Sequence, residues 1–369
     1  MKTAIEVSEV WQNTFAIGHG RRVTISQDVG SITLGAWDRP ETKVVATKRA
    51  SGPDEASARR ALGGLRVRAN PGGRGLSIEV GGAARGAFGF SRPGRVDLDV
   101  TVPRGLDVDV DTGSGAVLAE ELSGRLAIDT GAGPVTVARC AGKVTVDTGS
   151  GPVDVRETSG EVEVDTGSGT VNIDRVRGDV DVDTGNGSVR LRGVRARRIH
   201  VDTGRGEISG AFVPVRDGDY DFDTGLGSIE LRVPAQAAGR FDLEADGGAI
   251  HCHLPLVREE TRPGILRGVL KRGSCEVKGR AGRGDITVVA VSEADLGEET
   301  ADWRAADPVD TGPDQGPGPG PSGRRGLSME DEDYVRVLKM VEARRLTPEA
   351  AEQLLRALEE DDEADERPF

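Results

Sequence analysis

The residues with the clearest chemical potential are aspartates in a recurring pentapeptide, Asp-Thr-Gly-x-Gly. The first four intervals are each 18 residues, a degenerate copy begins at Asp246, and full copies begin at Asp111, Asp129, Asp147, Asp165, Asp183, Asp202 and Asp223. Two carboxylates held together can share a proton and activate water, and carboxylates from neighbouring turns can bind a divalent cation. The aspartates of the pentapeptide could therefore serve in catalysis, in calcium binding or in the structure of a turn.

Catalysis by these aspartates conflicts with their spacing. Asp-Thr-Gly-Ser is also the active-site signature of aspartic proteases, whose two aspartates meet in an apolar cleft. Copies at a constant interval place one aspartate in each structural repeat instead. We interpret them as turn residues whose carboxylates accept backbone N–H bonds, assisted by the threonines. Without a nucleophile and base pair, a phosphate loop or a recognisable metal set, the sequence predicts no enzyme.

Calcium binding is the less favoured alternative. Nine-residue β-roll repeats hold Ca²⁺ between turns of the form Gly-Gly-x-Gly-x-Asp, and the alternate turns here, such as residues 157–160 and 174–178, lack this pattern. A ladder of like charges is nevertheless costly unless hydrogen bonds or a cation compensate it. The candidate calcium ligands are Asp111, Asp129, Asp147, Asp165 and Asp183. The favoured interpretation needs no cofactor.

A second candidate metal site is the His251 and His253 pair. At this spacing both side chains project to one face of a strand, but zinc needs further ligands and none is adjacent in sequence. We therefore favour an ordinary exposed pair over a zinc site. Cys140, Cys252 and Cys275 show no Cys-x-x-Cys spacing, which indicates reduced thiols without a disulfide framework.

The elements that carry these residues follow from a nine-residue apolar period. Positions nine apart are all Val or Leu: Val108, Val117, Leu126, Val135, Val144, Val153, Val162, Val171, Val180 and Val189. A second apolar or small residue follows two positions later, which places both on one face of a short strand. Two strands and two glycine-containing turns make one coil of about 18 residues. The sequence thus predicts a mainly β fold, a parallel β-solenoid (β-helix) in which each coil is buried by its neighbours.

The coils become irregular toward both ends. We expect the β-solenoid domain over residues 1–296, with regular coils over about 96–232 and capping coils on either side. Residues 21–37 resemble an irregular early coil, and residues 53–62 have helical character that could cover an exposed strand edge. The last expected strand segments are 233–250 and 282–291.

The remaining residues change in composition and in period. Residues 297–327 are rich in Pro and Gly and predict a disordered linker, and residues 328–360 predict a small α-helical hairpin ahead of an acidic tail, 361–369. Ser328 and Thr347 are suited to cap its two helices. The apolar seam is too small to be very stable alone, so we expect it to bind a partner. Its seam residues are Tyr334, Val337, Leu338, Val341, Ala351, Leu354, Leu355 and Leu358.

Composition excludes several classes of partner. A net charge of −14 disfavours nucleic acid and anionic lipid, and the Arg190, Arg192, Arg195, Arg197 and Arg198 cluster is interpreted as a solvated face. Aromatic residues make up only 3% of the chain, which lowers the case for a polysaccharide-binding face. No secretory leader and no apolar run of transmembrane length is recognised, so we expect a cytoplasmic protein without a membrane segment.

Residues 96–117 (VDLDVTVPRGLDVDVDTGSGAV), residues 30–39 (GSITLGAWDR) and the pentapeptide array resemble the DUF4097 strand-repeat family, also called toastrack or adhesin-like domains, across about residues 20–292. Residues 331–360 resemble the short SHOCT-like helical hairpin that accompanies such domains in bacterial envelope-stress proteins. The resemblance implies a regulatory or scaffolding role in sensing envelope stress.

Two functions are consistent with these features. The first is a non-enzymatic scaffold or sensor that binds protein partners through the hairpin and the solenoid surface. The protein partner could also be a second copy of the chain. The alternative is a carbohydrate- or surface-binding, adhesin-like β-helix. An aromatic or carboxylate cluster on the outer face would distinguish the alternative.

Overall fold

The computed structural model describes residues 4–17, 21–82, 94–271, 273–292 and 296. Every described residue lies within the unit Met1–Ala305. Three predicted segments lie outside the described residues: the linker 297–327, the hairpin 328–360 and the tail 361–369.

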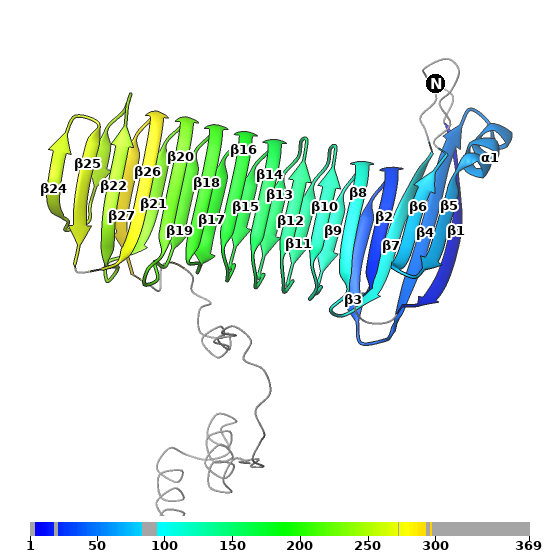
Figure 1. The fold of residues 1–369 in the computed structure, drawn as a ribbon. Helices are drawn as coiled ribbons and strands as arrows, with labels where there is room; N and C mark the ends of the chain where they lie inside the picture. The colour runs from blue at the N-terminus through cyan, green and yellow to red at the C-terminus, as the bar shows by residue number, and fades with distance from the viewer. Residues whose placement is uncertain (1–3, 18–20, 83–93, 272, 293–295, 297–369) are drawn as a thin grey trace, which may run out of the picture. The chain divides into compact units, whose positions relative to one another are not determined.

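The regular coils form two parallel sheets (Figure 1). Sheet A contains β9 (Val117–Glu120), β11 (Val135–Ala138), β13 (Val153–Arg156), β15 (Val171–Asp174), β17 (Val189–Val194), β19 (Ile208–Phe212) and β21 (Ile229–Pro234). Sheet B contains β8 (Asp107–Ser114), β10 (Leu126–Thr130), β12 (Val144–Thr148), β14 (Val162–Ser168), β16 (Val180–Asn186), β18 (Arg198–Arg205) and β20 (Asp219–Leu226). Each coil contributes one strand to each sheet, so the prediction of two strands and two turns per coil is confirmed.

The core lies between the two sheets and is built from the predicted apolar rows. Val135 stands opposite Val153 in sheet A, and Val144 stands opposite Val162 in sheet B. Every member of the nine-residue series from Val108 to Val189 is buried to 1% exposure or less. Because alternate side chains of a strand point to opposite faces, the residues between them face solvent. The predicted parallel β-solenoid is therefore confirmed.

The first coil in sequence is not at the end of the stack. It consists of β2 (Arg22–Val29) and β3 (Ile32–Trp37), which pair in parallel with β8 and β9. On its other side it pairs with β6 (Gly75–Gly81) and β7 (Arg95–Pro103). The irregular early coil predicted at residues 21–37 is thus present, and it has a neighbour on both sides.

Antiparallel strands finish this N-terminal end. Sheet A continues from β7 through β4 (Glu41–Gly52) to β1 (Ile5–Ala16), and sheet B ends on β5 (Arg66–Gly72). The predicted helix is present as α1 (Glu55–Gly64), which begins where the Asp54 carboxylate accepts a hydrogen bond from the Ser57 backbone N–H at 2.7 Å. It contacts β1 and β4.

The expected strand segments 233–250 and 282–291 are present, but at this end the order of coils in the stack differs from their order in the sequence. The last coil in sequence, β26 (Cys275–Arg283) and β27 (Ile286–Val291), lies between β20–β21 and the pair β22 (Gly239–Ala245) and β23 (Ile250–Cys252). Residues 282–291 are therefore not the last position of the stack. In this place both edges of β26 are hydrogen-bonded, which satisfies backbone groups that a terminal strand would leave unpaired.

A hairpin of β24 (Val257–Arg262) and β25 (Ile265–Leu270) ends sheet B through antiparallel pairing of β25 with β22. Sheet B thus finishes with an antiparallel strand at both ends, whereas sheet A finishes with the antiparallel β1 at one end and the parallel β23 at the other. Among the described residues no helix has the length and apolar character needed to span a membrane.

Candidate functional site

The repeated aspartates form a single row on the outer face of sheet B. Asp129 stands opposite Asp111 on one side and Asp147 on the other, and the same register continues through the later coils. Each aspartate follows a buried apolar residue and precedes a buried threonine, so strand alternation turns it outward. We call this set the Asp row: Asp111, Asp129, Asp147, Asp165, Asp183, Asp202 and Asp223.

A second outward row makes the same face more acidic. It lies two residues earlier in each strand, where Glu163 stands opposite Asp181, and Asp109 and Asp221 occupy equivalent positions. Neighbouring strands are about 4.8 Å apart, so carboxylates of adjacent coils are within strong Coulomb range. Three of these carboxylates have a basic partner, since Asp109 lies 3.0 Å from Arg22, Glu163 lies 3.1 Å from Lys143 and Asp221 lies 3.7 Å from Arg280. The carboxylates of sheet B that lack an ion pair are therefore mainly those of the Asp row.

The structure corrects the proposed hydrogen bonding of the Asp row. The carboxylates lie on strands, and within the described residues none of them accepts a backbone N–H bond from a turn. Other aspartates accept backbone N–H bonds, among them two at the starts of strands: Asp107 accepts from the Arg125 N–H and Asp179 from the Arg198 N–H, both at 3.0 Å. Sequence reasoning missed these two because they lie outside the pentapeptide.

The threonines of the pentapeptide point into the core, where two of them bond to the glycine turn of the preceding coil. Thr203 and Thr224 donate their hydroxyls to the carbonyls of Gly187 and Gly206 at 3.0 Å. In the earlier coils the buried hydroxyls have no partner among the described residues: Thr112, Thr130, Thr148, Thr166 and Thr184. The motif thus couples an exposed carboxylate to a buried hydroxyl and a glycine turn.

Glycine is required where the turn meets its neighbour. Gly151 has φ +138°, and a Cβ added there would collide with the carbonyl oxygen of Gly133 in the preceding coil. Only glycine combines this backbone conformation with so close an approach. The stacked turns therefore hold successive aspartates in register.

Counter-ions are scarce along the Asp row. Arg280 lies 3.8 Å from Asp223, at the C-terminal end of the row, whereas from Asp111 to Asp202 no ion pair forms among the described residues. Burial and the neighbouring Asp129 and Asp165 raise the pKa of Asp147. Burial, Asp181 and Asp202 likewise raise the pKa of Asp183. His200 acts in the opposite direction on the pKa of Asp183. From Asp111 to Asp202 the row therefore carries repulsion that no ion pair among the described residues compensates.

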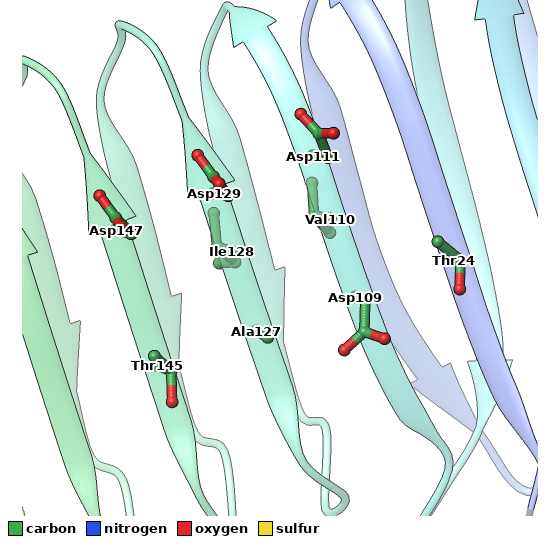
Figure 2. A pocket seen from close by; sticks show the side chains of 9 residues that line it. All are labelled: Thr24, Asp109, Val110, Asp111, Ala127, Ile128, Asp129, Thr145 and Asp147. Atoms are coloured by element: carbon green, nitrogen blue, oxygen red, sulfur yellow. The ribbon is translucent and has the colours of Figure 1, made fainter.

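A shallow depression of about 270 Å³ lies on this face. Figure 2 shows the side chains that line it. Ala127 forms its floor between Asp109 and Thr145, because its small side chain leaves room beside longer neighbours. The carboxylates at its margin are those of Asp109, Asp111, Asp129 and Asp147. The depression is open to solvent and has an apolar floor with carboxylates at its margin, whereas a carboxylate dyad is held in an enclosed cleft.

The candidate metal ligands do not come together in a coordination shell among the described residues. Within the described part of the chain, no group of three or more His, Cys, Asp or Glu side chains lies close enough to hold a metal ion. The candidate calcium ligands stand one per strand on an exposed surface. His251 is exposed on β23 and His253 is exposed just after it.

The outer face of sheet A differs from the Asp row because its carboxylates form ion pairs. Asp154 lies 3.5 Å from Arg156, Asp174 lies 3.3 Å from Arg175, and Glu230 lies 2.8 Å from Arg232. The arginine cluster of the sequence is divided between the sheets, since Arg190 and Arg192 lie on β17 and Arg198 lies on β18. Sheet A therefore presents mixed charge where sheet B presents mainly carboxylates.

The predicted partner-binding residues of the hairpin lie outside the described residues. They are Tyr334, Leu338, Val341, Leu354, Leu355 and Leu358. Their role stays a prediction.

Several solved structures resemble this chain at low sequence identity. A candidate cell adhesion protein from Clostridium sporogenes is 11% identical, with a TM-score of 0.19 over 78% of this chain and 99% of its own. A candidate adhesin from Bacteroides fragilis is 9% identical, with a TM-score of 0.31 over 76% and 97%. A candidate lipid-binding protein from Parabacteroides distasonis is 14% identical, with a TM-score of 0.39 over 76% and 96%.

No curated protein matches the sequence. The pattern of the family described as Toastrack DUF4097 matches residues 66–289, which covers most of the chain and all of its regular coils. This range includes every member of the Asp row. The chain belongs to the toastrack DUF4097 family.

Proposed function

We propose that the protein is a non-enzymatic scaffold or sensor that binds a positively charged protein partner on the outer face of sheet B. The observation that carries the proposal is the Asp row, which from Asp111 to Asp202 has no ion pair among the described residues. Charged faces of one sign attract partners of the opposite sign and accelerate their association. Because the row is fixed by stacked turns, little ordering is needed when a partner binds.

A catalytic role finds little support in this geometry. The aspartates that resemble a protease signature stand one per coil on an exposed face, not as a pair in an apolar cleft. The exposed face offers binding area and charge, which suit recognition more than acid-base chemistry.

The predicted hairpin supplies the second part of the proposal. Its apolar seam, which includes Leu354, Leu355 and Leu358, would bind a protein partner or another copy. The resemblance of residues 331–360 to a SHOCT-like hairpin supports a role in bacterial envelope-stress regulation. In this arrangement the solenoid and the hairpin would bring different partners together.

The alternative, an adhesin-like protein that binds carbohydrate, is less well supported. Carbohydrate-binding faces use exposed aromatic rings, but Phe212, Tyr220, Phe222 and Phe241 are fully buried in the core. Within the described residues no aromatic side chain is among the exposed large hydrophobics. The carboxylates of sheet B are what remains in favour of this alternative.

The test compares two full-length variants with the same change in net charge. One carries Asp147→Asn, Asp165→Asn and Asp183→Asn on sheet B, and the other carries Asp154→Asn, Asp174→Asn and Glu230→Gln on sheet A. Proteins retained from native lysate are quantified at low salt and at about 0.15 M salt. We expect the sheet B variant to lose partners that the sheet A variant retains.

Equal retention by both variants would refute sheet B as the binding face. The hairpin is tested separately with Leu354→Asp and Leu355→Asp in the full chain, which places charge on the apolar seam. Loss of a different set of partners is expected. If that variant retains every partner, the hairpin is not a docking module.

A further inference from the structure

Every open sheet has edges whose backbone groups can pair with another strand, and the described residues contain four of them. Sheet A ends on β1 and β23, and sheet B ends on β5 and β24. Proteins normally protect such edges with short strands, charges, proline or bulges. The four edges differ in how well they are protected.

Three of the edges carry such protection. β24 has a register shift between Arg258 and Glu260, which marks a bulge, and Glu260 pairs with Arg262 and with Arg267. β23 has only 3 residues. β5 carries Arg66 and Arg68 and contains Pro71, which cannot donate a backbone hydrogen bond.

The β1 edge carries none of these protections. It runs for 12 residues in unbroken register with β4 and contains no proline, glycine, lysine or arginine. Ile5 is 44% exposed and Val10 is 63% exposed, so β1 supplies two of the four exposed large hydrophobics of the described residues. Glu9 pairs with Lys48 at 3.1 Å, which leaves Glu6 as the unpaired charge of the strand.

The helix α1 covers the core-facing side of β1, but no described strand pairs with the outer edge of β1. Sheet A has β7, β4 and β1 beyond the first coil, whereas sheet B has β6 and β5, so β1 extends one strand further. The helix α1 contacts β1 and β4 in place of a facing strand, and its Ala58 and Leu62 are buried. Figure 1 shows β1 at the margin of the stack, with α1 beside the end at which β1 begins.

We propose that β1 pairs antiparallel with β1 of a second copy, about a two-fold axis at Val10. A strand edge is complementary to another strand, and an identical strand supplies the same length. With Val10 opposite Val10 of the partner copy, Glu6 faces Thr14 and Ile5 faces Phe15. No two carboxylates then face each other, and both exposed hydrophobics of β1 gain cover.

The pairing joins sheet A of the two copies into one continuous sheet. A two-fold axis of antiparallel edge pairing is perpendicular to the sheet, so both copies present sheet B on the same side. The dimer itself does not depend on the proposed function. If the acidic face binds a partner, the dimer presents two such faces together and binding becomes bivalent.

The first test is the mass of the full chain in solution, measured by sedimentation equilibrium over a range of concentrations. The expected species is a reversible dimer with twice the monomer mass of 38.8 kDa. Val10→Lys places two ammonium groups face to face across the axis and should weaken dimerisation about tenfold or more. Val257→Lys, on the edge strand β24 at the other end, is the matched control and should leave the dimer unchanged.

The second test is a disulfide cross-link across the axis. Directly opposite residues of an antiparallel pair have a Cα separation that a disulfide can bridge, so Val10→Cys should give a covalent dimer under mild oxidation. Val257→Cys, equally accessible at 73% exposure, should remain monomeric on a non-reducing gel.

A chain that stays monomeric without a Val10→Cys cross-link would overturn the proposal and would indicate that another segment of the same chain covers β1. A dimer that is unaffected by Val10→Lys would place the contact elsewhere in the chain and would also overturn it. Loss of partner binding by the Asp147, Asp165 and Asp183 variant, with the dimer intact, would separate this inference from the proposed function.

Discussion

The two sheets of the solenoid have nearly identical inner faces and very different outer faces. Inside, rows of Val, Leu and Ile stack in the same register in both sheets. Outside, sheet A pairs each of Asp154, Asp174 and Glu230 with an arginine, whereas sheet B repeats an unpaired aspartate from coil to coil. The inner rows and the glycine turns build the coils, so the difference between the outer faces is not explained by the requirements of the fold.

The largest expected effect comes from substitutions in the buried apolar rows, which both sheets share. Val153→Asp in sheet A and Val162→Asp in sheet B each bury a charge at a position that is 0% exposed. We expect each to lower the free energy of unfolding by about 4 kcal/mol or more, measured by denaturant unfolding followed by circular dichroism. Thr136→Asp, on the outward side of β11, is the control. Equal loss from Thr136→Asp would contradict the assignment of faces.

A smaller effect is expected at the corner between the sheets. Gly151→Ala introduces a Cβ against the Gly133 carbonyl at φ +138°, which should cost about 2 kcal/mol. Gly35→Ala has no heavy atom within 4 Å of the new Cβ and should be nearly neutral. Thermal unfolding of both variants distinguishes the stacked corner from an unconstrained glycine. Similar melting temperatures would show that the turns do not stack this closely.

Single carboxylates should have opposite effects on the two outer faces. Asp147→Asn removes repulsion from Asp129 and Asp165 and should stabilise the protein by about 0.3 kcal/mol. Asp174→Asn removes the ion pair with Arg175 and should destabilise it by a similar amount. Both differences should shrink when salt screens the charges, as followed by denaturant unfolding. Two losses of equal size would show that the Asp row is compensated.

The dependence of stability on pH sharpens the same comparison. The folded-state pKa values of Asp147, Asp183 and Asp223 are raised above 3.8, so folding binds protons and the free energy of unfolding falls as pH rises through this window. Replacing the three with Asn should therefore help most at neutral pH, and the benefit should vanish as pH falls below 3.8.

Glu260 provides the opposite case for this measurement. Its pKa is lowered by hydrogen bonds from Arg262 and Arg267, so its contribution is present above 4.5 and is lost as pH falls through the folded-state value. Glu260→Gln should thus cost stability at neutral pH and little in acid. A benefit of the triple Asn variant that persists below pH 3.8 would contradict the raised pKa values.

The regular coils were predictable because one strong period determines them. Val108 and its successors repeat every nine residues, and every one is buried in the structure. The order of coils at the ends was not predictable, since period alone does not say that β26 and β27 lie between β20–β21 and β22–β23. The hydroxyl of Tyr220, which donates to the Ala196 carbonyl and accepts from the Val215 N–H, was missed for a related reason, because it spans an irregular turn.

The candidate site was predicted in position but not in bonding. The spacing of the pentapeptide correctly predicts that Asp147 lies in a ladder of aspartates. The same residue types are common in turns and at strand ends, so the sequence does not show to which of the two Asp147 belongs. Only the backbone shows that the carboxylate faces outward while Thr148 faces the core. The open edge of β1 was likewise invisible, because pairing partners are a property of the assembled sheet.

The most direct test of the account is a side-chain carboxyl titration of the Asp row by nuclear magnetic resonance. We predict that the pKa of Asp147 lies above 3.8 and returns toward that value when Asp129→Asn and Asp165→Asn remove its neighbours. Asp154 on sheet A is the control carboxylate, since Arg156 lies beside it. An Asp147 pKa at or below the ordinary value, unchanged by the two substitutions, would contradict an uncompensated acidic row on sheet B.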